Sequence, residues 1–169
     1  MELILEISKL TKNINYHIYG DLKLANKNLK FRSLDNIKFF NHVDYFKIPK
    51  LMSKYNVLLM PYSKNVTVRS NNIDAGKYMS PLKLFEYLAM SKIIIASKLK
   101  VYSHILINNK NSILINSNKQ KLWASNIEFI FKNLKKYNFL KKSALQVSKK
   151  FTWEKRVEII LSSNNKFKN

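Results

Sequence analysis

Residues 80–90 read Ser-Pro-Leu-Lys-Leu-Phe-Glu-Tyr-Leu-Ala-Met, and residues 92–97 read Lys-Ile-Ile-Ile-Ala-Ser. Ser80 suits the N-cap of a helix, and Pro81 suits its first position, where a missing N–H costs nothing. The short, continuous apolar run at 93–96 is typical of a strand buried on both faces. This stretch therefore predicts a capped amphipathic helix that leads into a central strand of a parallel sheet.

The start of this helix offers a place for an anion. Free N–H groups and a partial positive charge at a helix N-terminus favour a phosphate. Glu86 follows Lys83 by three residues, so both side chains can emerge near the same end. The segment can thus hold a diphosphate and, beside it, a sugar hydroxyl.

Short apolar runs recur on both sides of this segment. They predict strands at Tyr16–Tyr19, Ile37–Phe40, Val57–Met60, Ile93–Ala96 and Ile113–Ile115. Helical patterns at 2–12, 48–54 and 82–90 separate some of them. The fold class expected is α/β, a doubly wound and mainly parallel sheet with right-handed crossovers.

The last third of the chain predicts helices. Trp123, Ile127, Ile130 and Leu134 form one apolar stripe, and Thr152 can cap a final helix. Tyrosines and tryptophans in these helices are expected in the core. We predict one domain over 1–169, with a frayed polar tail at 162–169.

A long polar segment, 63–79, precedes the helix start at Ser80 that is predicted to bind phosphate. Segments of this length are uncommon in compact domains unless they are functional or disordered. Both a substrate-covering loop and a disordered insertion fit the sequence.

The composition fits a globular protein, since 46% of the 169 residues are apolar. The chain has no cysteine, which excludes disulfides and cysteine-based zinc sites and favours a reducing cytoplasm. No apolar run approaches the roughly 20 residues of a membrane span. A cytoplasmic protein is expected, with the inner face of the membrane as an alternative location.

The formal net charge is +21. A polyanionic partner would explain it, either an anionic membrane face or a nucleic acid. Codon bias also explains it, because lysine, asparagine and isoleucine are abundant whereas arginine occurs only at 32, 69 and 156. Scattered lysines and few arginines make nucleic acid the least favoured partner.

Several common sites are excluded by residue counts. With glycines only at 20 and 76, neither a G-x-G-x-x-G fingerprint nor a Walker loop can occur. No D-x-D pair is present, and the three histidines lack ligand spacing. No metal and no cofactor are therefore expected.

An ordered series of motifs resembles the donor-binding core of GT-B glycosyltransferases of the group 1 (family 4) type. The helix and strand at 80–97 resemble the family's S-P-x-K-L-x-E-Y-x-A helix and its G-K-P-I-I-A-S strand. Upstream, the segment 16–21 resembles the family's strand that ends in Gly-Asp. The segment 36–43 resembles its N-V-x-F-x-G-x-V motif, and the segment 55–62 resembles its A-D-V-x-x-x-P motif. Downstream, 108–115 and 151–156 resemble E-N-G-x-L-V and F-T-W-x-x-R. Nearly the whole chain is covered, in order.

This resemblance implies roles for residues that bind a donor nucleotide. Glu86 would accept hydrogen bonds from the ribose, and the backbone at His42 and Val43 would meet the base. The N–H groups of Leu82 and Lys83, with the Lys83 ammonium, would face the diphosphate. Gly20 and Ser80 lie at neighbouring element ends and complete the predicted site. No side chain need act as nucleophile or base.

The resemblance implies transfer of a hexose from a nucleotide-diphosphate sugar to a glycan or lipid-linked acceptor, with retention, in polysaccharide biosynthesis. Two departures stand against it. Tyr78 occupies the position of the family's first glutamate, and both the R-x-x-x-x-K segment and the N-terminal acceptor domain are missing. The alternative is a non-catalytic module that binds a nucleotide or, through its basic surface, a partner.

Overall fold

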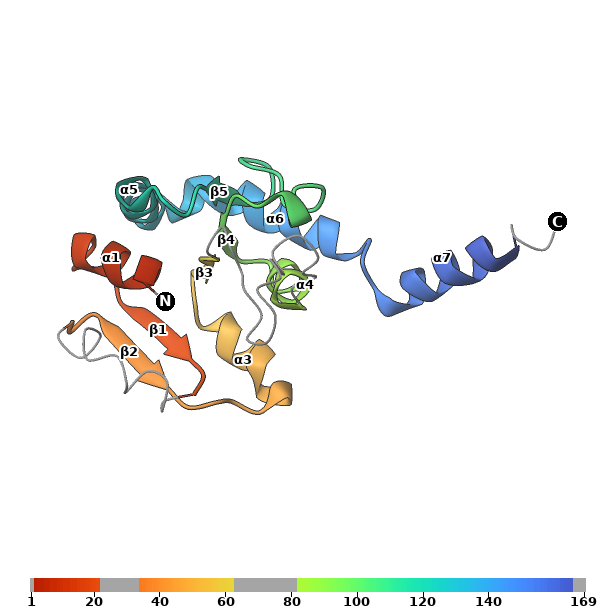
Figure 1. Cartoon of the computed structure of the whole chain (residues 1–169), viewed down its shortest axis with the longest axis horizontal. Helices are drawn as coiled ribbons and strands as arrows, with labels where there is room; N and C mark the ends of the chain where they lie inside the picture. The colour runs from red at the N-terminus through yellow and green to blue at the C-terminus, as the bar shows by residue number, and fades with distance from the viewer. Residues whose placement is uncertain (1, 22–33, 63–81, 166–169) are drawn as a thin grey trace, which may run out of the picture.

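The computed structural model describes residues 2–21, 34–62 and 82–165. All the described strands and several helices lie in the first two thirds of the chain, and helices follow (Figure 1). The elements are α1 (Glu2–Leu10), β1 (Tyr16–Tyr19), β2 (Ile37–Phe40), η2 (Tyr45–Lys47), α3 (Ile48–Ser53), β3 (Val57–Met60), α4 (Leu82–Ala89), β4 (Ile93–Ser97), η4 (Lys100–Tyr102), β5 (Ile113–Ile115), α5 (Gln120–Lys132), η5 (Leu134–Tyr137), α6 (Asn138–Ser148) and α7 (Trp153–Asn165).

Every strand pairing among the described residues is parallel, which confirms the predicted fold class. β1 pairs with β2, with Tyr16 opposite Ile37. β4 lies between β3 and β5, with Leu59 opposite Ile95 and Ile95 opposite Ile113. The strands therefore form two separate sheets, of two and three strands, where the sequence predicted one.

Two apolar clusters cover the two faces of the larger sheet. One packs α1 and α5 against side chains of both sheets, with Trp123, Ile127 and Ile130 fully buried. The other packs α4, α6 and η4 against the opposite face through Leu84, Leu88 and neighbouring residues. β4 is buried along its whole length, as its unbroken apolar run predicted.

Tertiary hydrogen bonds end α1 at Leu10, before the predicted end at Lys12. The Thr11 hydroxyl donates to the Ile7 carbonyl at 2.8 Å and lies 2.6 Å from the Tyr16 hydroxyl. The buried Asn36 amide lies 3.1 Å from each of three carbonyl oxygens that follow the last turns, those of Ser8, Thr11 and Ile14. The Ser8 and Thr11 carbonyls also accept the N–H groups of Thr11 and Ile14, so the Asn36 amide is a second donor to each and joins the end of α1 to the segment before β2.

A serine in the left-handed conformation follows α4. Ser91 has φ of 52°, and its N–H donates to the Leu88 carbonyl at 3.2 Å. Glycine is the usual residue at such a helix end, because a Cβ is strained there. The Ser91 hydroxyl donates to the Lys141 carbonyl at 3.1 Å, so it also ties α4 to α6.

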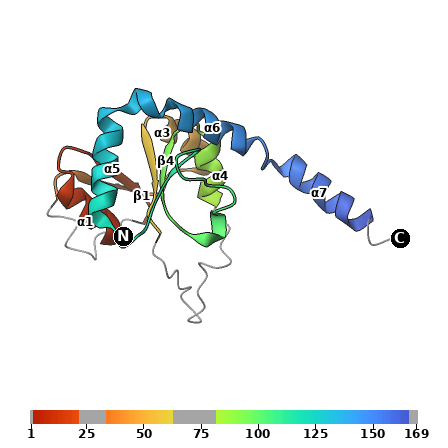
Figure 2. The same cartoon turned by 90° about the horizontal axis from the view of Figure 1, so that it is seen from above.

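The C-terminal helix α7 projects away from the rest of the molecule in both views (Figures 1 and 2). Thr152 caps it as predicted, since the Lys155 N–H donates to the Thr152 hydroxyl at 3.3 Å. The expectation that its tryptophan lies in the core was wrong. Trp153 is 73% exposed, whereas Trp123 is fully buried and donates to the Asn116 carbonyl. The frayed tail stays a prediction, since α7 continues to Asn165 and 166–169 lie outside the described residues.

Removing the Asn36 amide should destabilise the fold. We expect Asn36→Ala to lower the free energy of unfolding by about 1–3 kcal/mol, because the three buried hydrogen bonds of this amide are lost. Chemical denaturation followed by circular dichroism measures this. Asn126→Ala is the control: its amide donates to a single helical carbonyl, that of Leu122, and the change should stay within about 0.5 kcal/mol. Equal losses for both variants would contradict this role of Asn36.

Comparing two substitutions at Ser91 isolates the backbone strain. Both Ser91→Ala and Ser91→Gly lose the bond to Lys141, but only glycine accepts the positive φ without cost. We expect the glycine variant to be more stable than the alanine variant by about 1 kcal/mol. Thermal and urea unfolding of the pair test this, and an alanine variant of equal or greater stability would refute it.

Candidate functional site

A cavity of about 730 Å³ lies between the two sheets. Strands β1 and β3 form its walls, and side chains from α1, α3, α4 and α5 also line it. At one end it reaches the loop after β2 and the first turns of α4. In parallel sheets, this carboxyl end of the strands is where ligands bind.

Two faces of α4 have different surroundings, one in the apolar core and the other at the cavity. Leu84 and Leu88, four residues apart, are buried in the apolar cluster with α6. Lys83, Glu86 and Tyr87, spaced by three and four residues, line the cavity instead. Lys83 is exposed and Glu86 is half-buried.

The structure brings together four of the predicted site residues. His42 and Val43 follow β2 and line the same cavity as Lys83 and Glu86. Leu82 begins α4 but is 69% exposed and does not line the cavity. Gly20 follows β1, and a side chain placed there would meet open space. Ser80, Pro81, Tyr78 and the loop 63–79 lie outside the described residues.

The charges around the cavity favour an anionic ligand with hydroxyl groups. Glu86 is the one carboxylate among the described residues that line it, against the ammonium groups of Lys54 and Lys83. Lys83 and Glu86 do not pair with each other, since the described ion pair is Lys9 with Glu6 on α1. Both side chains therefore keep their hydrogen-bonding capacity for a ligand.

Sequence reasoning gave no role to Tyr87, which lines this site. Burial raises the pKa of Tyr87 to about 12, with smaller contributions from nearby Tyr62 and Glu86. Burial also raises the pKa of Tyr62, which follows β3. Both phenols are therefore neutral at physiological pH and can donate hydrogen bonds. Tyr87 was overlooked because it adjoins Glu86 in a helix whose periodicity predicted only a buried face and a solvated one.

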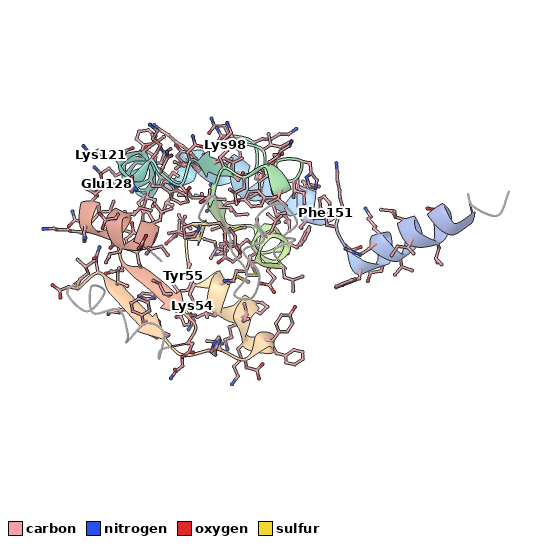
Figure 3. The ribbon with its side chains drawn as sticks, in the orientation of Figure 1. Lys54, Tyr55, Lys98, Lys121, Glu128 and Phe151 are labelled. Carbon is pink, nitrogen blue, oxygen red and sulfur yellow. The ribbon has the colours of Figure 1, made fainter. Side chains whose placement is uncertain are left out.

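A second group of aromatic residues, His17, Tyr19 and Tyr55, lines the cavity. The Tyr55 hydroxyl lies 2.7 Å from that of Tyr19 and 2.9 Å from Nδ1 of His17, so the segment before β3 reaches β1 (Figure 3). Burial is the main cause of the raised pKa of Tyr55, and its hydrogen bond with Tyr19 adds to it. Tyr19 also stacks on Phe40 of β2, with ring centroids 4.7 Å apart.

The described residues contain no group of three histidine or acidic side chains placed to hold a metal ion. Metal independence stays a prediction. None of the described helices combines the length and the apolarity that a membrane crossing requires.

Several solved structures share this fold. A glycosyltransferase from Rickettsia africae has 18% identity and a TM-score of 0.75, with 95% of this chain and 42% of that chain covered. HepE from Anabaena in complex with UDP has 14% identity and a TM-score of 0.74, with 96% and 45% covered; it was also solved with UDP-glucose. The C-terminal domain of a group 1 glycosyl transferase (LpcC) from Francisella tularensis has 16% identity and a TM-score of 0.65, with 86% and 75% covered.

This chain therefore spans less than half the length of the Rickettsia and Anabaena proteins. No curated protein matches it in sequence. Residues 2–147 match the family described as glycosyl transferases group 1. The chain belongs to the group 1 glycosyl transferase family, and its fold is that of the C-terminal lobe of GT-B glycosyltransferases.

Proposed function

We propose that this chain is the donor-binding lobe of a glycosyltransferase, which binds a nucleotide-diphosphate sugar in the cavity between the sheets. The observation that carries this is the meeting of Lys83 and Glu86, on α4, with His42 and Val43, after β2, in one cavity. HepE, which shares the fold, was solved with UDP and with UDP-glucose.

Each group has chemistry suited to part of such a ligand. The half-buried Glu86 carboxylate can accept two hydrogen bonds from a ribose diol, and charge strengthens such bonds. The Lys83 ammonium and the free N–H groups at the start of α4 suit the diphosphate. The backbone of His42 and Val43 can pair with the edge of the base.

Catalysis would then depend on stabilising charge as it develops. When the bond between the sugar and the diphosphate breaks, the leaving nucleoside diphosphate gains negative charge, which the start of α4 and Lys83 would stabilise. In this proposal no metal takes part, and the sugar, a hexose, is transferred with retention to a glycan or lipid-linked acceptor. A second lobe would supply the acceptor site, so the isolated chain is expected to bind the donor without turnover.

Replacing Glu86 tests nucleotide binding directly. We expect titration calorimetry to detect binding of at least one of UDP, GDP and ADP, and Glu86→Ala to weaken it at least tenfold, as loss of charged hydrogen bonds predicts. Glu128→Ala is the matched control, because this carboxylate lies on α5 outside the cavity lining and its loss should leave the affinity unchanged (Figure 3). Absence of binding by all three nucleotides, or equal effects of both variants, would overturn the proposal.

Replacing Lys83 tests whether this side chain binds the diphosphate and not the nucleoside. Lys83→Ala should weaken the preferred nucleoside diphosphate about tenfold, but should leave the affinity for the matching nucleoside nearly unchanged, because only the diphosphate carries the charge. Lys121→Ala on α5 is the control, because it removes the same charge at a position away from the cavity. It should leave both affinities unchanged. An equal loss for nucleoside and diphosphate would show that Lys83 acts elsewhere.

A further inference from the structure

Two large aromatic side chains lie on the outer side of the helices α5 and α6, away from the core. The core faces of these helices are buried, with Trp123 and Ile127 on α5 and Leu140 on α6. Phe129 of α5 is 54% exposed, and Phe139 of α6 is 50% exposed. Their rings therefore remain in contact with water, although the same helices bury other apolar side chains.

Tyr137 joins these two rings into one aromatic row, which consists of Phe129, Tyr137 and Phe139. The Tyr137 ring meets Phe129 edge-on, with ring centroids 6.4 Å apart, and stacks on Phe139 at 6.3 Å. Tyr137 lies in η5, between α5 and α6, and also packs against the core cluster. Because Tyr137 is anchored in this way, the aromatic row has a fixed place at the edge of the molecule where α5 and α6 meet (Figure 2).

Lysines surround the aromatic row. The segment 129–142 has no acidic residue and five lysines, which are Lys132, Lys135, Lys136, Lys141 and Lys142. All of them except Lys141 are exposed, and none is ion-paired with an acid in the described part of the chain. Glu128, the one acid of α5, lies about 100° round the helix from Phe129. The rings are therefore set in a region of positive charge.

Exposed rings among lysines match the surface of an anionic bilayer. A phenyl ring gains free energy when it leaves water for the boundary between head groups and acyl chains, while lysine ammonium groups stay among the acidic head groups. Clusters of about four to eight basic residues on such a surface are typical of binding to anionic lipid. A nucleic acid fits less well, because the segment 129–142 has no arginine to make bidentate contacts with phosphates.

We propose that the aromatic row and the lysines around it form a docking surface for an anionic lipid bilayer. Phe129 and Phe139 insert at the lipid boundary, and Lys132, Lys135 and Lys136 bind the acidic head groups. Apolar burial and charge complementarity together supply the affinity. None of these residues lines the cavity, so the inference is independent of nucleotide binding.

Vesicle flotation tests the proposal. The 169-residue protein is mixed, at about 0.1 M salt, with vesicles of phosphatidylcholine alone or with one third phosphatidylglycerol. We expect it to bind the anionic vesicles at least about tenfold more tightly than the neutral ones, and to dissociate at about 0.5 M salt.

Replacing both phenylalanines tests the insertion of the rings. The double variant Phe129→Gln/Phe139→Gln should bind anionic vesicles at least about tenfold more weakly, because less apolar surface leaves water. Phe46→Gln is the matched control, since this ring is 89% exposed on η2, outside the docking surface. It should leave vesicle binding unchanged.

Replacing lysines tests the electrostatic part. Changing Lys132, Lys135 and Lys136 together to glutamine should weaken binding at least about tenfold. The control makes the same change in net charge at three exposed lysines on β2, η2 and α3, and should weaken binding less than about threefold; these are Lys38, Lys47 and Lys50. Circular dichroism verifies folding, and if the double phenylalanine variant unfolds, the two lysine variants still decide the question.

Several results would overturn the proposal. They are no binding to anionic vesicles, an equal loss of binding for Phe46→Gln and the double variant, and an equal loss for the two lysine variants. A dimer in gel filtration that the double variant dissociates would show that a second copy covers the aromatic row. If the double variant lost binding to a single-stranded oligonucleotide but not to vesicles, the surface would bind nucleic acid.

Discussion

Side-chain packing between α1 and α5 holds the two sheets together, because no backbone hydrogen bonds between strands link β1 to β3 in the described structure. This packing buries Leu5 and Ile7 of α1 against Trp123 and Ile127 of α5. A parallel sheet normally gains its rigidity from the ladder as well as from its faces. Here the halves are connected by apolar packing between α1 and α5 and by the side-chain hydrogen bonds of Tyr55 with Tyr19 and His17.

The same arrangement explains why one cavity combines two chemistries. At the carboxyl ends of the strands, the walls are polar side chains from α4 and from the loop after β2. Deeper between the strands, the walls are backbone edges and apolar side chains. The hydroxyl and phosphate groups of the proposed nucleotide need the first environment.

Much of the fold could be predicted from local sequence. The apolar runs at 93–96 and 57–60 predicted buried strands, because the residues of a parallel strand meet apolar neighbours on both faces. The spacing of Lys83 and Glu86 predicted a shared helix face. The end of α1 could not be predicted in this way, since Asn36, which lies more than 20 residues away in sequence, donates to carbonyls in and after its last turn. Trp153 has the residue type and the spacing of a core residue, but no described element covers it.

The sequence by itself determined the elements and the chemistry that each carries, because helical and strand periods and the charge of each side chain are local properties. Only the tertiary structure decided which residues share a cavity. It placed Glu86 with His42 and Val43, left Leu82 in solvent, and added Tyr87 and Tyr55. It also divided one expected sheet into two. Such outcomes depend on contacts between segments far apart along the chain, and no local pattern records whether an edge or an apolar face will find a partner.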